Sequence, residues 1–203
     1  MSRLTLIVAA TLENGIGQNA GLPWRLPKEM AYFAKATSNA PEGKRNAVIM
    51  GRNTWESIPT KFRPLKDRVN VVISRNKEYQ LQAQGPAHVC DSLESALSFL
   101  SEPGNFNSPI HRIFVIGGAT LYNETLQLSP SASSFVDRIL LTRIQSPTFE
   151  CDTFMPDFQS VKGLESTWKQ SSSAELREWI GFDVAAGVQE EKGVQYEFQM
   201  WVR

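Results

Sequence analysis

The sequence has few residues that could build a covalent or metal framework. Its 203 residues include two cysteines, Cys90 and Cys151, and two histidines, His88 and His111. Two thiols are too few for a disulfide scaffold, and these four residues lack the spacing of a metal site. We therefore expect buried free thiols and no bound metal.

The chain also lacks an excess of charge of either sign. Its 21 basic residues balance 21 acidic ones. No large net field would draw it to nucleic acid or to an anionic membrane, so we expect neither as a partner. A ligand has to be recognised by local groups instead.

Long apolar runs are missing as well, since none reaches the roughly 18 residues that a membrane helix needs. The short run 4–10 has the minimal length of a signal-peptide core. Its β-branched Thr5, Ile7 and Val8 suit a buried strand better. We therefore expect a cytoplasmic protein.

Strand-like and helix-like segments alternate over most of the chain. Strands are predicted at 4–10, 46–50, 69–73, 87–90, 112–116, 136–144, 178–184 and 194–202, and helices near 25–38, 52–58, 91–101 and 118–127. Interleaved helices indicate crossover connections and a parallel sheet. The last predicted strand alternates apolar and mostly polar residues, as an antiparallel strand would when paired with 179–184.

We therefore expect an α/β fold in which residues 1–203 form a single domain. Its centre would be a mostly parallel sheet of eight strands with about four flanking helices. A C-terminal antiparallel hairpin would complete the sheet.

Two of the predicted strands end in glycine and lead into a helix. The second strand runs into Gly51 and Arg52, and the fifth runs into Gly117 and Gly118. Glycine lets the backbone approach a phosphate, and a helix N-terminus offers unpaired N–H groups. Tight turns need glycine in any α/β protein, so each signal is weak alone. Together the two cradles suggest a dinucleotide.

The third predicted strand ends in Ser74 and Arg75 where an acidic residue could stand. Ligands of α/β sheets lie beyond the carboxyl ends of strands, where an acid favours a free ribose hydroxyl and an arginine favours a 2′-phosphate. We therefore predict NADPH. The glycines do not have the G-x-G-x-x-G spacing, and G-x-x-x-x-G-K-[ST] is absent, which argues against a standard Rossmann domain and a P-loop nucleotidase.

One acidic residue falls among the apolar positions of the first predicted helix. Leu26, Met30, Phe33 and Ala34 recur at helical spacing, and Glu29 shares their face. Such a carboxylate could simply reach solvent at a rim. The glycine-studded loop before the helix is long enough to close over a ligand, and it favours an active site.

Several short blocks, spread nearly from end to end, together point to one enzyme family. They are Ile7-Val8-Ala9, Gly15-Ile16-Gly17, Leu22-Pro23-Trp24, Met50-Gly51-Arg52, Thr54-Trp55-Glu56-Ser57-Ile58-Pro59, Arg63-Pro64-Leu65, Ile116-Gly117-Gly118, Thr142-Arg143-Ile144 and Asp152-Thr153-Phe154. In combination they resemble the dihydrofolate reductases, and the length and loop insertions resemble a eukaryotic member. Enzymes of this family use NADPH to reduce 7,8-dihydrofolate to tetrahydrofolate.

The resemblance implies roles around the substrate. Glu29 would bind the pterin ring, and Thr142 would support its carboxylate. Leu22 and Trp24 would order the loop that admits the water for protonation of pterin N5. Arg68 would bind the α-carboxylate of the substrate's glutamate with both ends of its guanidinium. The other residues expected around the substrate are Ile7, Val8, Met30, Phe33, Ile58, Leu65, Ile116 and Tyr122.

The resemblance likewise assigns residues to NADPH. Those expected at the nicotinamide are Ala9, Ile16, Gly17 and Leu22. Those expected at the phosphates are Gly51, Arg52, Asn53, Thr54, Gly117, Gly118, Ala119, Thr120 and Leu121. Ser74 and Arg75 would hold the 2′-phosphate. Related animal enzymes often have a second arginine there, but this chain has Asp91, which also suits a helix N-cap.

Two other hypotheses stay open at this point. A reductase of the same fold, such as those of riboflavin biosynthesis, would use the cofactor cradles without needing a receptor for a glutamate tail. A nucleotide-binding regulatory module would use the cradles and catalyse nothing. Arg68 and Glu29 together favour dihydrofolate, a small-molecule partner, and we expect the protein to be a monomer.

Overall fold

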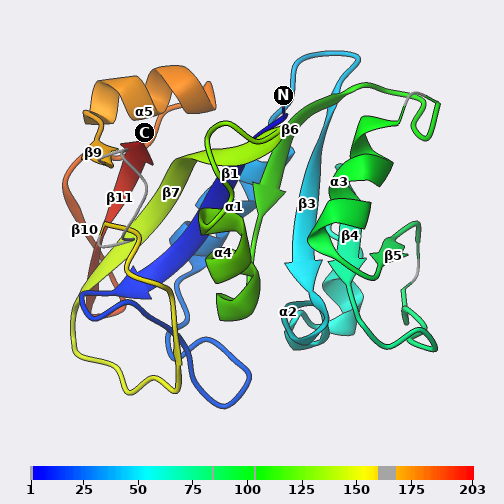
Figure 1. Cartoon of the computed structure of the whole chain (residues 1–203). Helices are drawn as coiled ribbons and strands as arrows, with labels where there is room; N and C mark the ends of the chain where they lie inside the picture. Colours follow the sequence, from blue (N-terminus) through cyan, green and yellow to red (C-terminus); the bar gives the residue numbers. More distant parts are fainter. Residues whose placement is uncertain (1, 84, 103, 160–167) are drawn as a thin grey trace.

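A large twisted sheet forms the centre of the protein (Figure 1). The computed structural model describes residues 2–83, 85–102, 104–159 and 168–203. The strands of this sheet are β1 (Ser2–Thr11), β3 (Arg45–Gly51), β4 (Arg68–Ile73), β5 (His88–Cys90), β6 (Ile110–Val115), β7 (Ser134–Ser146), β9 (Lys169–Gln170), β10 (Val188–Glu191) and β11 (Val194–Val202).

Eight of these strands lie side by side in the order β10-β11-β7-β1-β6-β3-β4-β5, and the short β9 pairs with β11. The five pairs from β7 through β5 are parallel, whereas β11 is antiparallel to β7, β9 and β10. The predicted mixed, mostly parallel sheet is therefore confirmed. Because parallel strands share one direction, the carboxyl ends of β1, β3, β4, β5 and β6 meet at one edge.

Helices cover both faces of the sheet (Figure 1). Within the described residues they are α1 (Pro27–Ser38), α2 (Arg52–Ser57), α3 (Leu93–Ser101), α4 (Ala119–Leu126) and α5 (Ser173–Ile180), with a 3₁₀ turn at Thr60–Phe62. On β1, side chains alternate between two cores. Leu6 and Val8 pack with α3 and α4, whereas Ile7 packs with α1, α2 and α5.

The strand predicted at 178–184 is wrong, because α5 runs through residue 180 and residues 181–184 form no strand. Ser172 begins the helix through a capping box: its hydroxyl accepts from the N–H of Glu175 at 3.3 Å, and the Glu175 carboxylate accepts from the N–H of Ser172 at 2.7 Å. Gly181, with φ 80°, ends the helix in the left-handed region. The capping box and Gly181 thus define the two ends of a helix, although the apolar residues in the segment suggest a strand.

The C-terminal hairpin is confirmed, but its first strand is β10 and not residues 179–184. β10 and β11 pair from Val188↔Glu197 to Glu191↔Val194. Lys192 and Gly193 connect them with φ values of 53° and 75°. Two consecutive positive φ angles belong to a tight hairpin turn whose twist matches that of the strands.

A second, two-stranded sheet stands apart from the central one. It pairs β2 (Gly15–Gly17) with β8 (Thr153–Phe154). Neither strand is predicted from the sequence, because each is too short to show a period. This small sheet ties the glycine-studded loop to a segment that lies far away in the sequence.

Two composition-based expectations can be compared with the structure. Cys90 and Cys151 are both free, as expected, although each is half-buried rather than buried. None of the helices in the described segments is long and apolar enough to cross a membrane.

Candidate active site

The carboxyl group of Glu29 is buried in the first turn of α1. The residue is only 6% exposed, and the hydroxyl of Thr142 on β7 donates to its Oε1 at 3.1 Å. Burial raises the pKa of Glu29 to about 7, while the Thr142 hydrogen bond acts in the opposite direction. In the part of the chain that the structure describes, no lysine, arginine or histidine pairs with this carboxyl. Glu29 can therefore gain or lose a proton near neutral pH.

Three phenols and a second acid surround Glu29. Burial and the Glu29 charge both raise the pKa of Tyr32 on α1 and of Tyr122 on α4. Burial, Glu191 and Glu29 together raise the pKa of Tyr196 on β11 to about 12. The phenols stay protonated at neutral pH, so the environment holds donors and negative charge but no cation among the described residues.

The apolar stripe predicted on α1 is only partly correct, since Leu26 is buried and Phe33 packs against the core, but Met30 and Ala34 do not. Met30 is 48% exposed and Ala34 is also exposed, so they do not share the buried face with Glu29. The buried residues of α1 are Glu29, Tyr32, Ala36 and Thr37. Glu29 and Thr37 are half of these residues and are polar, so hydrophobicity alone identifies the buried face only in part.

Most of the predicted apolar pocket residues gather on the α1 face of the sheet. Those that pack together there are Ile7, Phe33, Ile58, Leu65 and Ile116. Three others lie elsewhere: Val8 and Tyr122 belong to the core on the opposite face, and Met30 is exposed. Tyr122 is still linked to this region, since its hydroxyl donates to the carbonyl oxygen of Ile7 at 2.8 Å.

Arg68 is buried at the start of β4 and anchored on two sides. Its Nε donates to the carbonyl of Lys66 at 2.8 Å, and one terminal nitrogen donates to the hydroxyl of Thr37 at 2.6 Å. Burial lowers the pKa of Arg68 to about 10, so the guanidinium stays charged at neutral pH. Thr37 lies in the last turn of α1, and Glu29 lies in the first. Glu29 and Thr37, which anchors Arg68, are therefore about 12 Å apart along the helix.

The two predicted phosphate cradles are neighbours in the sheet. β3 and β6 pair in parallel, and the N–H of Gly51 donates to the carbonyl of Gly117 at 2.8 Å. Arg52, Asn53 and Thr54 form the first turn of α2, and Ala119, Thr120 and Leu121 form the first turn of α4. The structure thus brings the predicted phosphate residues together at one edge.

Two of the glycines in these cradles lie close to a neighbouring side chain. A Cβ atom on Gly117 or Gly118 would lie 3.3 or 3.4 Å from the hydroxyl of Thr54. Gly117 also has a φ of 120°, which L-residues rarely adopt. Backbone that is kept bare at the start of two helices suits the close approach of phosphate groups.

The predicted 2′-phosphate residues continue the same row. Ser74 is buried and follows β4, and Arg75 beside it is exposed. The ends of β6, β3, β4 and β5 are successive neighbours, and at ~4.8 Å per strand they form a row about 14 Å long. A dinucleotide in an extended form can lie across such a row.

The suggestion that Asp91 caps a helix is wrong in detail, because Ser92 is the N-cap of α3. The hydroxyl of Ser92 accepts from the N–H of Ser95. Asp91 instead accepts from the hydroxyls of Ser95 and Ser92, at 2.7 and 3.1 Å, and these bonds lower its pKa. A stable negative charge therefore stands at the end of β5, next to the strand that leads to Arg75.

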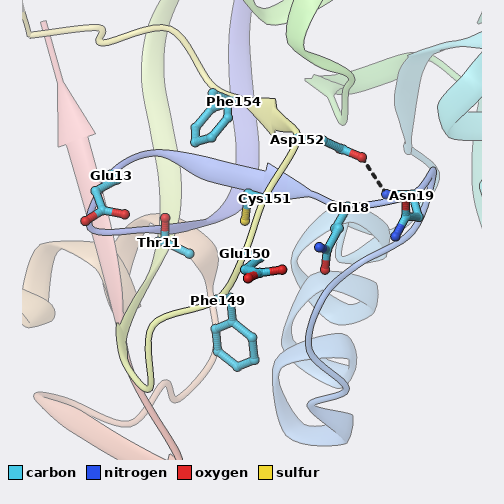
Figure 2. Close-up of a pocket in the computed structure, with 9 residues that line it drawn as sticks. All are labelled: Thr11, Glu13, Gln18, Asn19, Phe149, Glu150, Cys151, Asp152 and Phe154. Carbon is cyan, nitrogen blue, oxygen red and sulfur yellow. Dashed lines mark hydrogen bonds between the residues drawn. The ribbon is translucent and has the colours of Figure 1, made fainter.

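Residues 15–24, called the lid loop below, are tied to the segment after β7. Asn19 donates its N–H to the carboxylate of Asp152 at 2.7 Å, as Figure 2 shows. Gly15 packs so closely on Cys151 that a Cβ there would lie 2.5 Å from the sulfur. A cavity of about 500 Å³ opens beside this contact (Figure 2), and none of the predicted site residues lines it.

The predicted residues of the lid loop differ in exposure. Leu22 is 53% exposed, whereas Trp24 is 6% exposed and packs with Tyr196, with Ala9 at the edge of that cluster. The indole N–H of Trp24 is buried without a hydrogen-bond partner among the described residues. Ile16 and Gly17 in β2 are half-buried.

Known proteins of one family resemble this chain over nearly its whole length. The sequence model of the family "Dihydrofolate reductase" matches residues 3–186. The chain belongs to the dihydrofolate reductase family. Members of this family are oxidoreductases. A dihydrofolate reductase of Cryptococcus neoformans is 50% identical over 98% of this chain and 94% of its own length. That of Pneumocystis carinii is 44% identical over 98% and 96% of the two chains.

The fold comparison gives the same family. The structure of Schistosoma mansoni dihydrofolate reductase superposes with a TM-score of 0.76 at 34% identity, and it covers 99% of this chain and 98% of that one. The predicted fold class is thereby confirmed in its main features.

Several residues of this dihydrofolate reductase-like site are absent from the sequence-based set. Thr37 anchors Arg68, and Glu191 approaches the first turn of α1. Asn70 holds the loop at Leu65 by accepting from its N–H at 2.9 Å and donating to its carbonyl at 2.8 Å. Thr37 could have been found from its position two helical turns after Glu29. Glu191 carries no local signal, because its contact depends on the fold.

Proposed function

We propose that this protein catalyses the NADPH-dependent reduction of 7,8-dihydrofolate to 5,6,7,8-tetrahydrofolate, by hydride transfer to pterin C6 and water-mediated protonation of N5. The observation that carries the proposal is Glu29, a buried carboxyl with a hydroxyl partner and no cation among the described residues. The 2-amino group and ring N–H of a pterin are donors that such a carboxylate can bind side by side.

The position of Arg68 supports an elongated substrate that ends in a carboxylate. Glu29 and the Arg68 anchor on Thr37 stand at opposite ends of α1, about 12 Å apart. Pterin and glutamate are separated in dihydrofolate by an aminobenzoyl group, which would lie along this helix near Phe33. Ile7, Ile58, Leu65 and Ile116 would exclude water from the pterin ring.

The proton for N5 would come from water and not directly from Glu29. A carboxyl that grips the 2-amino side of the ring cannot reach N5 on the other side. Because the pKa of Glu29 is about 7, its carboxyl could gain or lose a proton as the protonation state of the bound pterin changes. The buried indole N–H of Trp24 is a donor that an ordered water could satisfy next to the lid loop.

The cofactor assignment follows from the row of strand ends. NADPH, when bound, supplies the hydride. Gly51, Gly117 and Gly118 leave the backbone bare for its phosphates, and Ser74 with Arg75 would hold the 2′-phosphate. The residues present therefore fit this group. Ala9, Ile16 and Gly17 would face the nicotinamide.

The decisive experiment mixes the protein with NADPH and dihydrofolate and follows the loss of NADPH absorbance. Glu29→Gln should slow hydride transfer by roughly 10²–10⁴-fold and leave NADPH binding close to normal. Glu42→Gln, on an exposed loop residue, is the control and should behave like the wild type. Wild-type turnover in Glu29→Gln would remove Glu29 from the mechanism.

The same assay separates the two competing hypotheses. Turnover of a pyrimidine or tail-less pterin substrate in preference to dihydrofolate would indicate a reductase of another specificity. NADPH binding without any turnover would indicate a regulatory module. We further propose that residues 1–203 act as one domain, as a monomer, in the cytoplasm.

A further inference from the structure

Helix α1 lacks a cap of its own. Its N-cap residue is Leu26, whose side chain cannot accept a hydrogen bond, and Pro27 follows. The early N–H groups of a helix have no partner within the helix. The N–H of Lys28 finds one in Glu191, whose two carboxylate oxygens lie at 3.1 and 3.0 Å.

Glu191 comes from the opposite end of the chain and is fixed in place. It is the last residue of β10, where it pairs with Val194 across the hairpin turn. The hydroxyl of Tyr196 lies 3.5 Å from Glu191 Oε2. The carboxylate is therefore set against the turn of α1 that carries Glu29.

We propose that Glu191 is a positioning residue for the catalytic carboxyl: it holds the first turn of α1 in place and presents a second negative charge to Glu29. The inference rests on the proposed function, since it assigns a role toward the residue on which that function depends.

The charge of Glu191 favours the protonated form of Glu29. Burial is the main cause of the raised pKa of Glu29, and Glu191 adds to it, whereas Thr142 opposes both. The other titratable groups that face Glu29 are Tyr32, Tyr122 and Tyr196, which stay neutral near pH 7. Among the described residues, Glu191 is thus the charged group that tunes this carboxyl.

Two substitutions separate the cap from the charge. Glu191→Gln keeps an oxygen that can accept from Lys28 but removes the charge, whereas Glu191→Ala removes both. Glu190→Gln is the matched control, because Glu190 is the exposed neighbour on β10 and successive side chains of a strand point to opposite faces.

The direct measurement is the titration of the Glu29 carboxyl carbon by ¹³C NMR in the protein without substrate, with the signal assigned by its loss in Glu29→Gln. Glu191→Gln should move the midpoint to lower pH at nearly unchanged Tm. Glu191→Ala should in addition lower Tm by roughly 2–4 °C, as for the loss of a helix cap. Glu190→Gln should match the wild type in both.

The pH dependence of single-turnover hydride transfer should move in the same direction in Glu191→Gln. An unchanged Glu29 midpoint in Glu191→Gln, or an equal change in Glu190→Gln, would overturn the proposal. The NMR titration does not need turnover. A wild-type protein that fails to reduce dihydrofolate would therefore refute the proposed function and leave the Glu191 result readable.

Discussion

The hydroxyl of Thr142 donates to the carboxyl of Glu29 at 3.1 Å and joins two residues that are 113 positions apart in the sequence. Thr142 lies on an inner strand of the sheet and is 2% exposed, so a water molecule has little access to take the place of its hydroxyl. The bond favours the ionised form of Glu29, against the effect of burial. Under the proposed function, binding of a pterin would depend on the balance between this hydrogen bond and burial.

Thr142→Val should therefore raise the pKa of Glu29 further and weaken dihydrofolate binding at pH 7. A hydrogen bond to a charged group is worth about 1.5–3 kcal/mol, and this much stabilisation of the carboxylate would be lost. Thr142→Ser keeps the hydroxyl and should stay near the wild type. Titration of Glu29 by ¹³C NMR and the KM for dihydrofolate test this, and equal behaviour of the two variants would contradict it.

Glu29 should also make the stability of the folded protein depend on pH. Its pKa is raised from 4.5 to about 7 on folding. The folded state therefore binds the proton more tightly, and the contribution is complete below pH 4.5 and lost as pH rises to about 7. At roughly 1.4 kcal/mol per pKa unit, the loss is on the order of 3 kcal/mol.

Urea unfolding of the wild type and of Glu29→Gln between pH 4.5 and 8 measures this contribution. The amide of the variant stays neutral at every pH, as the protonated carboxyl is at low pH. The free energy of unfolding of Glu29→Gln should therefore lack this dependence on pH, and the variant should be the more stable protein at pH 8. Glu42→Gln should keep the wild-type slope. Parallel stability curves for the wild type and Glu29→Gln would show that the carboxyl titrates normally in the folded protein.

We expect Arg68 to bind the α-carboxylate of the glutamate tail of the substrate. A planar guanidinium matches a carboxylate with two bonds, which lysine cannot reproduce. Arg68→Lys should raise the KM for dihydrofolate by about tenfold or more and leave a tail-less dihydropterin unaffected.

Thr37→Val offers a milder version of the same test, since it releases the guanidinium without removing it. The KM for dihydrofolate should rise less than in Arg68→Lys, again with no effect on the tail-less substrate. Equal losses on both substrates would mean that Arg68 is structural.

Arg75 should set the preference for NADPH over NADH. Arg75→Ala should weaken NADPH by roughly 10- to 150-fold, the value of one charge-assisted contact of about 1.5–3 kcal/mol, and spare NADH. Asp91→Arg should tighten NADPH and steepen its salt dependence.

Asp91 also accepts bonds from Ser92 and Ser95, so Asp91→Asn is needed beside it to separate lost charge from lost bonds. Kinetics with both cofactors at two ionic strengths measure these effects. Full NADPH preference in Arg75→Ala would place the 2′-phosphate elsewhere.

The parallel half of the sheet could be predicted because its strands are buried on both faces. Runs such as 46–50 and 69–73 are almost entirely apolar, and Gly51 marks the end of the first. The wrong strand at 178–184 has a different cause. A short apolar run fits a strand or a helix, and the capping box at Ser172 had to decide between them.

The sequence and its family resemblance name candidate site residues, but they do not reveal the contacts between those residues. Glu29 shares a helix face with apolar residues, and the family resemblance points to Arg68, although Lys66 and Asp67 precede it. Their partners Thr37, Thr142 and Glu191 meet them only through the packing of α1 on the sheet. The buried face of α1 was predicted only in part for the same reason, since its polar residues are buried by partners that no local pattern reveals.

The contact between Lys28 and Glu191 spans 163 positions, and it has a consequence for biosynthesis. A ribosome delivers the chain from its amino end, so α1 exists long before β10 and β11 are made. Until then β7 is an open edge, and the first turn of α1 has no cap. A nascent chain that stops before the hairpin should therefore carry Glu29 without an ordered site around it. Under the proposed function, competence to bind dihydrofolate would be acquired only after β10 and β11 have been made.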